Sequence, residues 1–283
     1  MNRRASALSA ARSAAEGTVI VAAFFDTVLL PRLIAHEPEG HVQHYLVSLA
    51  HRVMAQVQGL RCLEHIAHFQ LVVAGCRSLL ELVADASLVA NREPEDAVHR
   101  IETWELSSKL KYAEATLAYL NRRGEKPGQA EAPLVDFCSR WKETIEAKRK
   151  SFWPAKSGKG RHPMRWTDQD LGTDLRRVDR LEGTDLERFY ETEYRRMNWQ
   201  IHGSGLAGIR GLDFPLLGVV FSVAHKMSGQ LALQVARVLV RETSLLDDRG
   251  LAALDLAEEQ WRLITLRGLI NLENVQRSSG ADQ

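Results

Sequence analysis

Apolar residues recur at steps of three and four residues through most of this chain, and almost no segment alternates between apolar and polar positions. The clearest stripe lies within residues 60–92 and consists of Cys62, Ile66, Phe69, Val73, Cys76, Leu80 and Val83. Residues with this spacing share one face of an α-helix. The stripe therefore predicts a long helix that packs into a core.

A second long helix is predicted over residues 213–242. Asp213 is suited to the N-cap of this helix, and Pro215 to its first turn. One side of the helix is apolar, and the other carries the polar row Lys226, Gln230, Gln234, Arg237 and Arg241. The helix is therefore amphipathic, with one side expected to face the core and the other to face away from it.

Together these patterns predict an all-α fold. Further helices are predicted over residues 17–36, 39–58, 95–120, 133–150 and 249–276. Segment 151–172 is rich in glycine and proline and is long enough to indicate a functional loop. The predicted parts are an N-terminal helical extension (1–59), a helical core that includes this loop (60–243), and a C-terminal helix with a tail (244–283).

The composition is that of an ordinary globular protein, because 45% of the 283 residues are hydrophobic and 26% are charged. With 37 basic and 36 acidic residues the net charge is +1, so any nucleic-acid site must be local. Three scattered cysteines indicate neither a disulfide framework nor a zinc site, which favours a cytoplasmic protein. The apolar run over residues 19–25 is too short to span a membrane, so neither export nor membrane insertion is predicted.

A helix that carries candidate catalytic residues is predicted to begin at Thr184 and to end at Gly203. Thr184 and Glu187 have the spacing of a capping box, which favours a helix start there. At 100° per residue, one face of this helix holds Leu186, Tyr190, Met197 and Ile201. The opposite face holds Glu191, Arg195, Asn198 and His202.

Arg195 and His202 together point to phosphate chemistry. A histidine exchanges a proton near neutral pH, and a guanidinium binds a phosphate through two hydrogen bonds. Such a pair suffices for attack by an RNA 2′-hydroxyl on the adjacent phosphate without a metal ion. A polar row of this kind is equally typical of a helix face that only meets solvent.

Tyr194-Arg195 and His202-Gly203, with six residues between the arginine and the histidine, resemble the R-x4-6-H motif of the HEPN superfamily (higher eukaryotes and prokaryotes nucleotide-binding domains). The chain is more closely similar to one HEPN-like family of domains of unknown function. That family carries an upstream arginine and glutamate, matched by Arg77 and Glu81, and a tryptophan-containing stretch, matched by residues 165–167. The likeness covers about residues 60–210 in the same order.

This resemblance implies a HEPN-like antiparallel helical bundle with additional N- and C-terminal helices that forms a homodimer and cleaves RNA without a metal or a cofactor. Arg195 would then bind the phosphate, and His202 would act as acid or base. Arg196 also fits the motif, with five intervening residues, and Asn198 lies on the same face as His202. The supporting residues of the cleft would be Arg77, Glu81, Glu191 and Tyr194.

Arg77 and Glu81 also have a simpler interpretation. They are four residues apart and face the same way, so they form an intrahelical pair whose order is the less favourable one for the helix dipole. The pair is therefore either part of the cleft of His202 or a packing salt bridge.

Residues 142–166 contain eight basic and two acidic side chains, with aromatic residues interleaved. Single-stranded nucleic acid is bound by such mixtures of phosphate contacts and stacking surfaces. The candidate nucleic-acid-binding residues are Lys156, Lys159, Arg161, Arg165 and Trp166. The alternative is a solvated loop whose aromatic side chains pack on the core.

Two further motifs are weaker indications of function. Residues 203–208 match G-x-G-x-x-G, but no strand precedes them, so a helix C-cap followed by a tight loop is the better interpretation. Six histidines cluster within 33 residues: His36, His41, His44, His51, His65 and His68. They lack an accompanying carboxylate set, so surface or interhelical positions are expected rather than a metal site.

The leading hypothesis is a metal-independent endoribonuclease, or the RNA-handling half of a defence or toxin system, with RNA or another nucleotide as its ligand. The main alternative is a non-catalytic helical binding or regulatory module. A third is a metal-binding bundle that uses the N-terminal histidines.

Overall fold

The computed structural model describes residues 3–155, 162–195, 197 and 214–280, and the side chains of these residues between 8 and 267 except 214–216. The described residues form helices and no strand, which confirms the all-α class. The helices are α1 (Arg3–Phe24), α2 (Leu30–Ala35), α3 (Gly40–Arg61), α4 (Phe69–Ala90), α5 (Ala97–Arg122), α6 (Ala132–Phe152), α7 (Leu171–Glu182), α8 (Leu186–Phe189), α10 (Phe214–Thr243) and α11 (Asp248–Gly280). Two π-helical turns, η1 (Phe25–Leu29) and η3 (Tyr190–Tyr194), and one 3-10 turn, η2 (Ile66–His68), join some of them.

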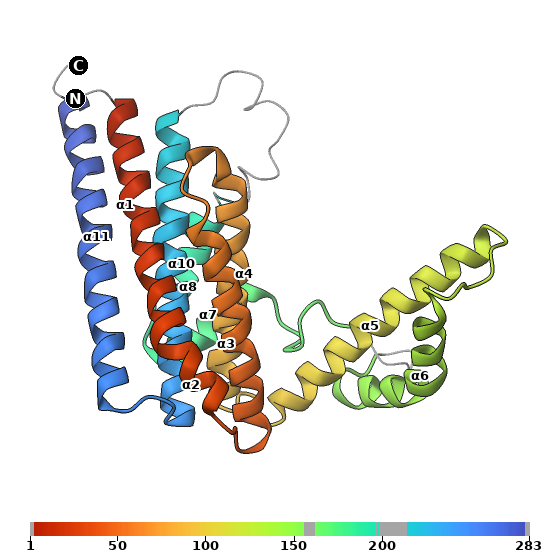
Figure 1. Cartoon of the computed structure of the whole chain (residues 1–283). Helices are drawn as coiled ribbons and strands as arrows, with labels where there is room; N and C mark the ends of the chain where they lie inside the picture. The colour runs from red at the N-terminus through yellow and green to blue at the C-terminus, as the bar shows by residue number, and fades with distance from the viewer. Residues whose placement is uncertain (1–2, 156–161, 196, 198–213, 281–283) are drawn as a thin grey trace. The chain divides into compact units, whose positions relative to one another are not determined.

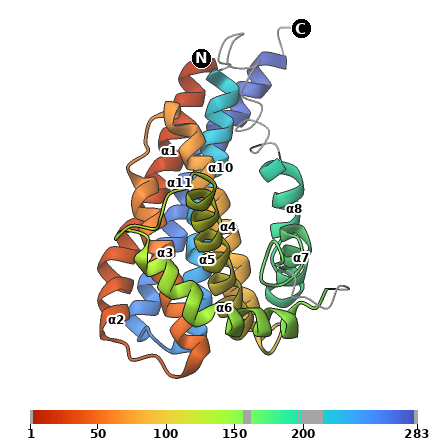
Figure 2. The ribbon, with the colours of Figure 1, turned by 90° about the vertical axis from the view of Figure 1, so that its right-hand side faces the viewer.

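The chain forms two compact units, residues 1–91 with 175–283 and residues 92–174. In the first unit α10 is central and contacts α1, α3, α4 and α11 (Figure 1). Turning the view by a quarter shows the same helices running side by side (Figure 2). Helix α1 packs against both α10 and α11, so the two ends of the chain complete one bundle.

This division differs from the predicted one. Residues 1–59 and 244–283 are not additions to a separate core, because apolar residues of α1 such as Val21 and Ala22 are fully buried. Helix α1 also begins at Arg3 instead of residue 17, in an alanine-rich segment of high helix propensity. The N- and C-terminal helices therefore belong to the same core as α4 and α10.

The segment Leu8–Ala35 is long and apolar enough to cross a membrane by its length and composition. The expectation from sequence considered only the uninterrupted apolar run over residues 19–25. The longer segment meets the length and composition of a membrane span because the mean hydropathy of an 18-residue window within it is high. Core helices pass the same test, and 39% of the qualifying stretch is buried inside the protein.

The predicted core stripe is found in α4. Val73, Cys76, Leu80 and Val83 of α4 are buried, as is Ile66 in the turn η2 before it, and Phe69 is half-buried. Its first member departs from the prediction, because the chain leaves helix α3 at Arg61 and Cys62 is exposed in the turn that follows. Helix α4 therefore starts at Phe69, after the short turn η2.

The second unit is built on a hairpin of α5 and α6. Gly124 follows α5 with a φ of +70°, a left-handed conformation that glycine adopts without strain, and ends the helix. Lys142 of α6 pairs with Glu114 of α5 at 2.7 Å, and Arg100 lies over the ring of Phe152 at 5.2 Å. The segment after α6 packs against this hairpin, where the Trp104 indole N–H donates to the carbonyl of Pro163 at 3.1 Å.

Candidate functional site

The helix predicted from Thr184 begins at Leu186, but a different residue caps it. The two carboxylate oxygens of Asp179, on α7, accept hydrogen bonds from the backbone N–H groups of Leu186 and Glu187 at 2.7 and 2.8 Å. The Thr184 hydroxyl donates to the same carboxylate at 2.6 Å. The Glu187 side chain pairs instead with Arg176. The predicted capping box is thus replaced by a cap from the preceding helix.

The π-turn η3 changes which residues of this helix face inward. An ideal α-helix would bury Tyr190, but the exposed fractions of Leu186, Phe189, Tyr194 and Met197 are 2%, 8%, 5% and 2%. The step of five residues from Phe189 to Tyr194 matches the wider i→i+5 turn. The backbone therefore turns Tyr194 inward and leaves Arg195, the next residue, at the surface.

Tyr194 joins the upstream arginine to this helix. Its ring stacks on that of Tyr190 with a centroid separation of 4.8 Å, and the guanidinium carbon of Arg77 lies 5.9 Å from the Tyr194 ring centroid. A guanidinium at this distance from an aromatic face is attracted by the ring's electron density. Residues of α4 and η3 that are more than a hundred positions apart in the sequence thus meet at one place.

The charged side chains around Tyr194 are accessible. Arg77 and Glu81 pair at 3.4 Å along α4, and the exposed fractions of their side chains are 47% and 41%. Arg195 pairs with Glu191 at 2.9 Å, with exposed fractions of 65% and 41%. Both pairs are exposed, so each is weak and can open for a ligand. We call Arg77, Glu81, Glu191, Tyr194 and Arg195 the tyrosine–arginine cluster.

The other predicted site residues near this helix, Arg196, Asn198 and His202, lie outside the described residues, as does the glycine-rich segment 203–208. Lys156, Lys159 and Arg161 of the predicted nucleic-acid site lie outside them too. Those predictions stay predictions.

Arg165 and Trp166, also predicted to bind nucleic acid, have structural roles. The Arg165 Nε–H donates to the carboxylate of Asp174 at 2.7 Å, and the Thr167 hydroxyl donates to the same oxygen at 2.8 Å. Asp174 is buried; this raises the pKa of its carboxyl, and Arg165 opposes the rise. Trp166 is 2% exposed, so its ring offers no stacking surface for a base. Trp166 is thus packed on a core, as the alternative interpretation expects of the aromatic side chains, and the Arg165 guanidinium is held by a buried carboxylate.

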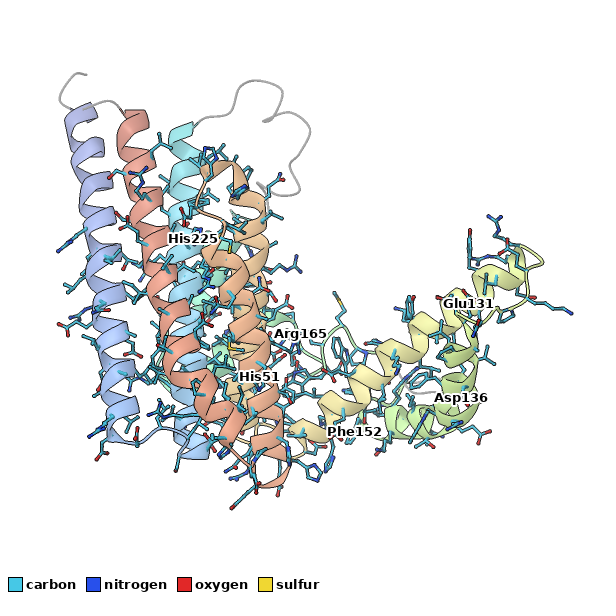
Figure 3. The ribbon with its side chains drawn as sticks, viewed as in Figure 1. His51, Glu131, Asp136, Phe152, Arg165 and His225 are labelled. Atoms are coloured by element: carbon cyan, nitrogen blue, oxygen red, sulfur yellow. The ribbon has the colours of Figure 1, made fainter. Side chains whose placement is uncertain are left out.

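The histidines form no metal centre in the described part of the chain, where no group of three or more His, Cys, Asp or Glu side chains is placed to hold an ion. The rings of His65 and His68 meet edge to face, with their centroids 6.2 Å apart. His225 lies on α10, inside the first unit (Figure 3). Its Nε2–H donates to the Leu63 carbonyl at 3.1 Å, and its Nδ1 therefore accepts from the Thr18 hydroxyl at 2.9 Å.

Sequence reasoning missed one prominent feature, a groove between α10 and α11. The polar row on α10, interpreted as an outward face, lines this groove together with residues of α11. The four-residue spacing of the polar side chains on α10 was the available signal for this groove. The sequence does not show that α11 forms its other wall.

Comparison of the chain with protein-family models, with curated proteins and with solved structures finds no match.

Proposed function

We propose that the protein is a metal-independent endoribonuclease of the HEPN type, in which Arg195 binds the scissile phosphate and His202 transfers the proton. The observation that carries the proposal is the contact between Arg77 and Tyr194. It joins the arginine–glutamate element and the Tyr-Arg element of the motif in one accessible cluster. A shared functional site requires the two elements to lie together in the fold. Two independent polar helix faces that only meet solvent would not need to be in contact.

The chemistry needs only groups of this kind. The 2′-oxygen of a ribose attacks the adjacent phosphorus, the bond from phosphorus to the 5′-oxygen breaks, and a 2′,3′-cyclic phosphate and a 5′-hydroxyl result. One group takes the proton of the 2′-hydroxyl and another gives a proton to the leaving oxygen, and His202 serves one of these roles. Arg195, freed from Glu191 by the phosphate, offsets the charge that develops on the phosphorane oxygens.

In a homodimer, as the resemblance implies, a second copy of the motif would supply the other proton-transfer group. Arg77 adds a positive charge over the ring of Tyr194, the residue before Arg195, and this contact joins the two elements. RNA is the proposed substrate and the cytoplasm the proposed location.

We predict that the purified protein cuts single-stranded RNA in the presence of EDTA and leaves 2′,3′-cyclic phosphate ends. His202→Ala and Arg195→Ala should each lower the initial rate by about 100-fold or more, because each removes a group that acts in the transition state. Arg188→Ala is the matched control, since Arg188 is a 79% exposed arginine of the same helix outside the cluster. A His202→Ala variant that cleaves as fast as the parent contradicts the proposal.

The second candidate function is a non-catalytic RNA-binding module, favoured by the ion pair that Arg195 makes with Glu191 on its own helix. Such a module binds RNA with a strong dependence on salt and releases it uncut. The same incubation separates the two functions, because intact RNA that is retained on the protein at low salt is the signature of the module.

A further inference from the structure

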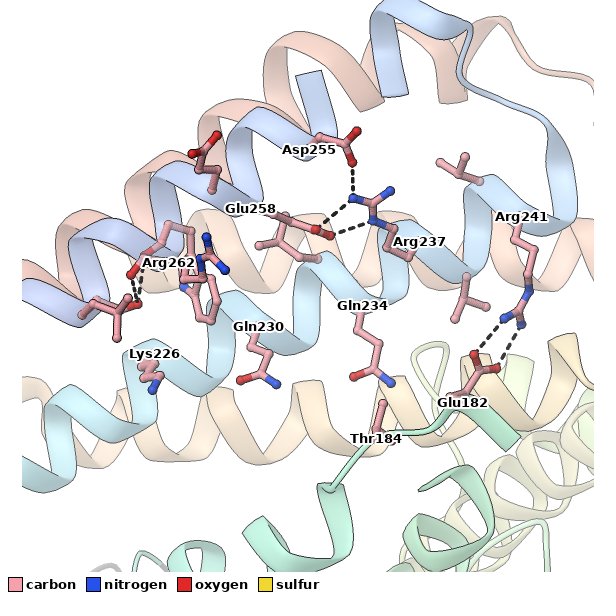
Figure 4. A pocket seen from close by; sticks show the side chains of 17 residues that line it. Glu182, Thr184, Lys226, Gln230, Gln234, Arg237, Arg241, Asp255, Glu258 and Arg262 are labelled. Carbon is pink, nitrogen blue, oxygen red and sulfur yellow. Dashed lines mark hydrogen bonds and ion pairs between the residues drawn. The ribbon is translucent and has the colours of Figure 1, made fainter. Parts of the chain in front are cut away.

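The groove between α10 and α11 has a volume of about 1090 Å³ (Figure 4). Helix α10 contributes Lys226, Gln230 and Gln234, which follow one another at four-residue steps. Helix α11 contributes Trp261 and Arg262, and the α7–α8 connection contributes further lining residues. With a rise of about 1.5 Å per residue, the row from Lys226 to Gln234 covers roughly 12 Å of the groove.

Charge is distributed unevenly along this groove. At one end Arg237 is held by Asp255 and by Glu258, the latter at 2.8 Å, and Arg241 makes two bonds to Glu182 at 2.8 and 3.0 Å. Arg241 donates to Glu182 and so lowers the pKa of that carboxyl below its usual range. These cations are compensated by the protein itself.

The other end carries Lys226 of α10 and Arg262 of α11, both labelled in Figure 4. Neither has a carboxylate within 4.0 Å among the side chains that the structure describes, although Glu259 also lines the groove. Two cations and one carboxylate, none of them in an ion pair among the described side chains, therefore line the groove beside the compensated pairs. This end of the groove has an excess of positive charge.

The groove is also lined by Gln234, whose side-chain nitrogen is buried and lacks an acceptor within the described residues. A buried donor without a partner costs about 1–3 kcal/mol, so native proteins seldom leave one unsatisfied. An acceptor that enters the groove would remove this cost.

We propose that the groove binds a small organic anion, a phosphate or a carboxylate. Its charged head lies between Lys226 and Arg262, and its uncharged body, which carries hydrogen-bond acceptors, lies along Gln230 and Gln234. At the far end of the groove, the ion pairs of Arg237 and Arg241 fix the positions of the lining side chains. This site uses no residue of the tyrosine–arginine cluster and does not depend on cleavage of RNA.

Isothermal titration calorimetry of the full chain with AMP, adenosine and inorganic phosphate at low salt tests this proposal. These probes represent head with body, body alone and head alone. AMP is expected to bind saturably and more tightly than phosphate, and adenosine to bind weakest. The double variant Lys226→Met/Arg262→Met should weaken AMP binding by at least about tenfold, and Gln234→Leu by several-fold, because each removes a donor to the ligand.

Arg249→Met is the matched control, since Arg249 is an exposed arginine of α11 outside the groove. Its AMP affinity should equal that of the parent, and circular dichroism checks that every variant keeps its helices. The proposal is overturned if AMP and phosphate show no saturable binding at millimolar concentrations. It is also overturned if Arg249→Met weakens AMP as much as the double variant does.

Discussion

Replacing Gly229 by alanine is expected to destabilise the protein by about 2 kcal/mol, although the same exchange in an exposed helix normally stabilises. A Cβ at Gly229 would lie 2.9 Å from Cδ1 of the Trp261 indole and closer still to its Nε1. The indole has little room to retreat, because a Cβ at Gly17 of α1 would already lie 3.3 Å from the same Cδ1. The indole of Trp261, on α11, thus fills a space that exists only because Gly229 of α10 has no side chain.

The expected loss of stability in Gly229→Ala is the difference between two opposing contributions. Overpacking a filled core costs about 1–3 kcal/mol, and alanine recovers up to about 1 kcal/mol of helix propensity. Urea unfolding followed by circular dichroism measures the difference. Gly59, near the end of α3, has no atom within 4 Å of its added Cβ, so Gly59→Ala should be more stable than the parent by about 0.5–1 kcal/mol.

Two results would contradict this picture of the α1–α10–α11 junction. One is a Gly229→Ala variant as stable as Gly59→Ala. The other is a double variant Gly229→Ala/Trp261→Leu that is less stable than the sum of the single changes, because the smaller leucine should relieve the clash.

Acidification from pH 6.5 to pH 4 is expected to remove about 3 kcal/mol of stability through His225 alone. Burial lowers the pKa of His225 to about 4, against an ordinary value of 6.5, while its bond to Leu63 opposes the shift. Between these two values the unfolded chain holds a proton that the folded protein does not, so stability falls as the pH falls. Above pH 6.5 both states are neutral and the contribution of His225 does not change.

The measurement compares unfolding free energies of the parent and His225→Gln at several pH values. Glutamine keeps an N–H for the Leu63 carbonyl but does not titrate in this range. The other titrating groups cancel in the difference, so the parent should lose its advantage over the variant as the pH falls from 6.5 to 4. A difference that stays constant with pH would show that His225 is not held neutral. An NMR titration of the imidazole provides the same answer for the folded parent.

Most helices were predictable from periodicity because their apolar faces are regular. The segment predicted over 213–242 is α10, Phe214–Thr243, and the segment predicted over 95–120 is α5, Ala97–Arg122. The start of α1 was missed because alanine gives a weak hydrophobic signal while it favours the helix strongly. Helix α7 was missed because it begins at Leu171, within the stretch interpreted as a loop.

The candidate site was predictable only in part, for reasons that lie in its backbone and its distant contacts. Sequence spacing placed Arg195 on the exposed face of its helix, but it could not foresee the π-turn that buries Tyr194. The contact of Tyr194 with Arg77 depends on how two helices pack, which no local pattern specifies. Arg165 is a basic residue like Lys156, Lys159 and Arg161, which the sequence predicts to bind nucleic acid, and only its buried partner Asp174 reveals its structural role.

The most direct test of the proposed function uses two oligonucleotides of one sequence, an RNA and its counterpart with 2′-deoxyribose at every position, incubated with the full chain in EDTA. If the tyrosine–arginine cluster and His202 promote attack by the 2′-hydroxyl, the RNA is cut to 2′,3′-cyclic phosphate ends while the deoxy strand stays intact. Cleavage of both strands at similar rates, or of neither, would contradict the proposal.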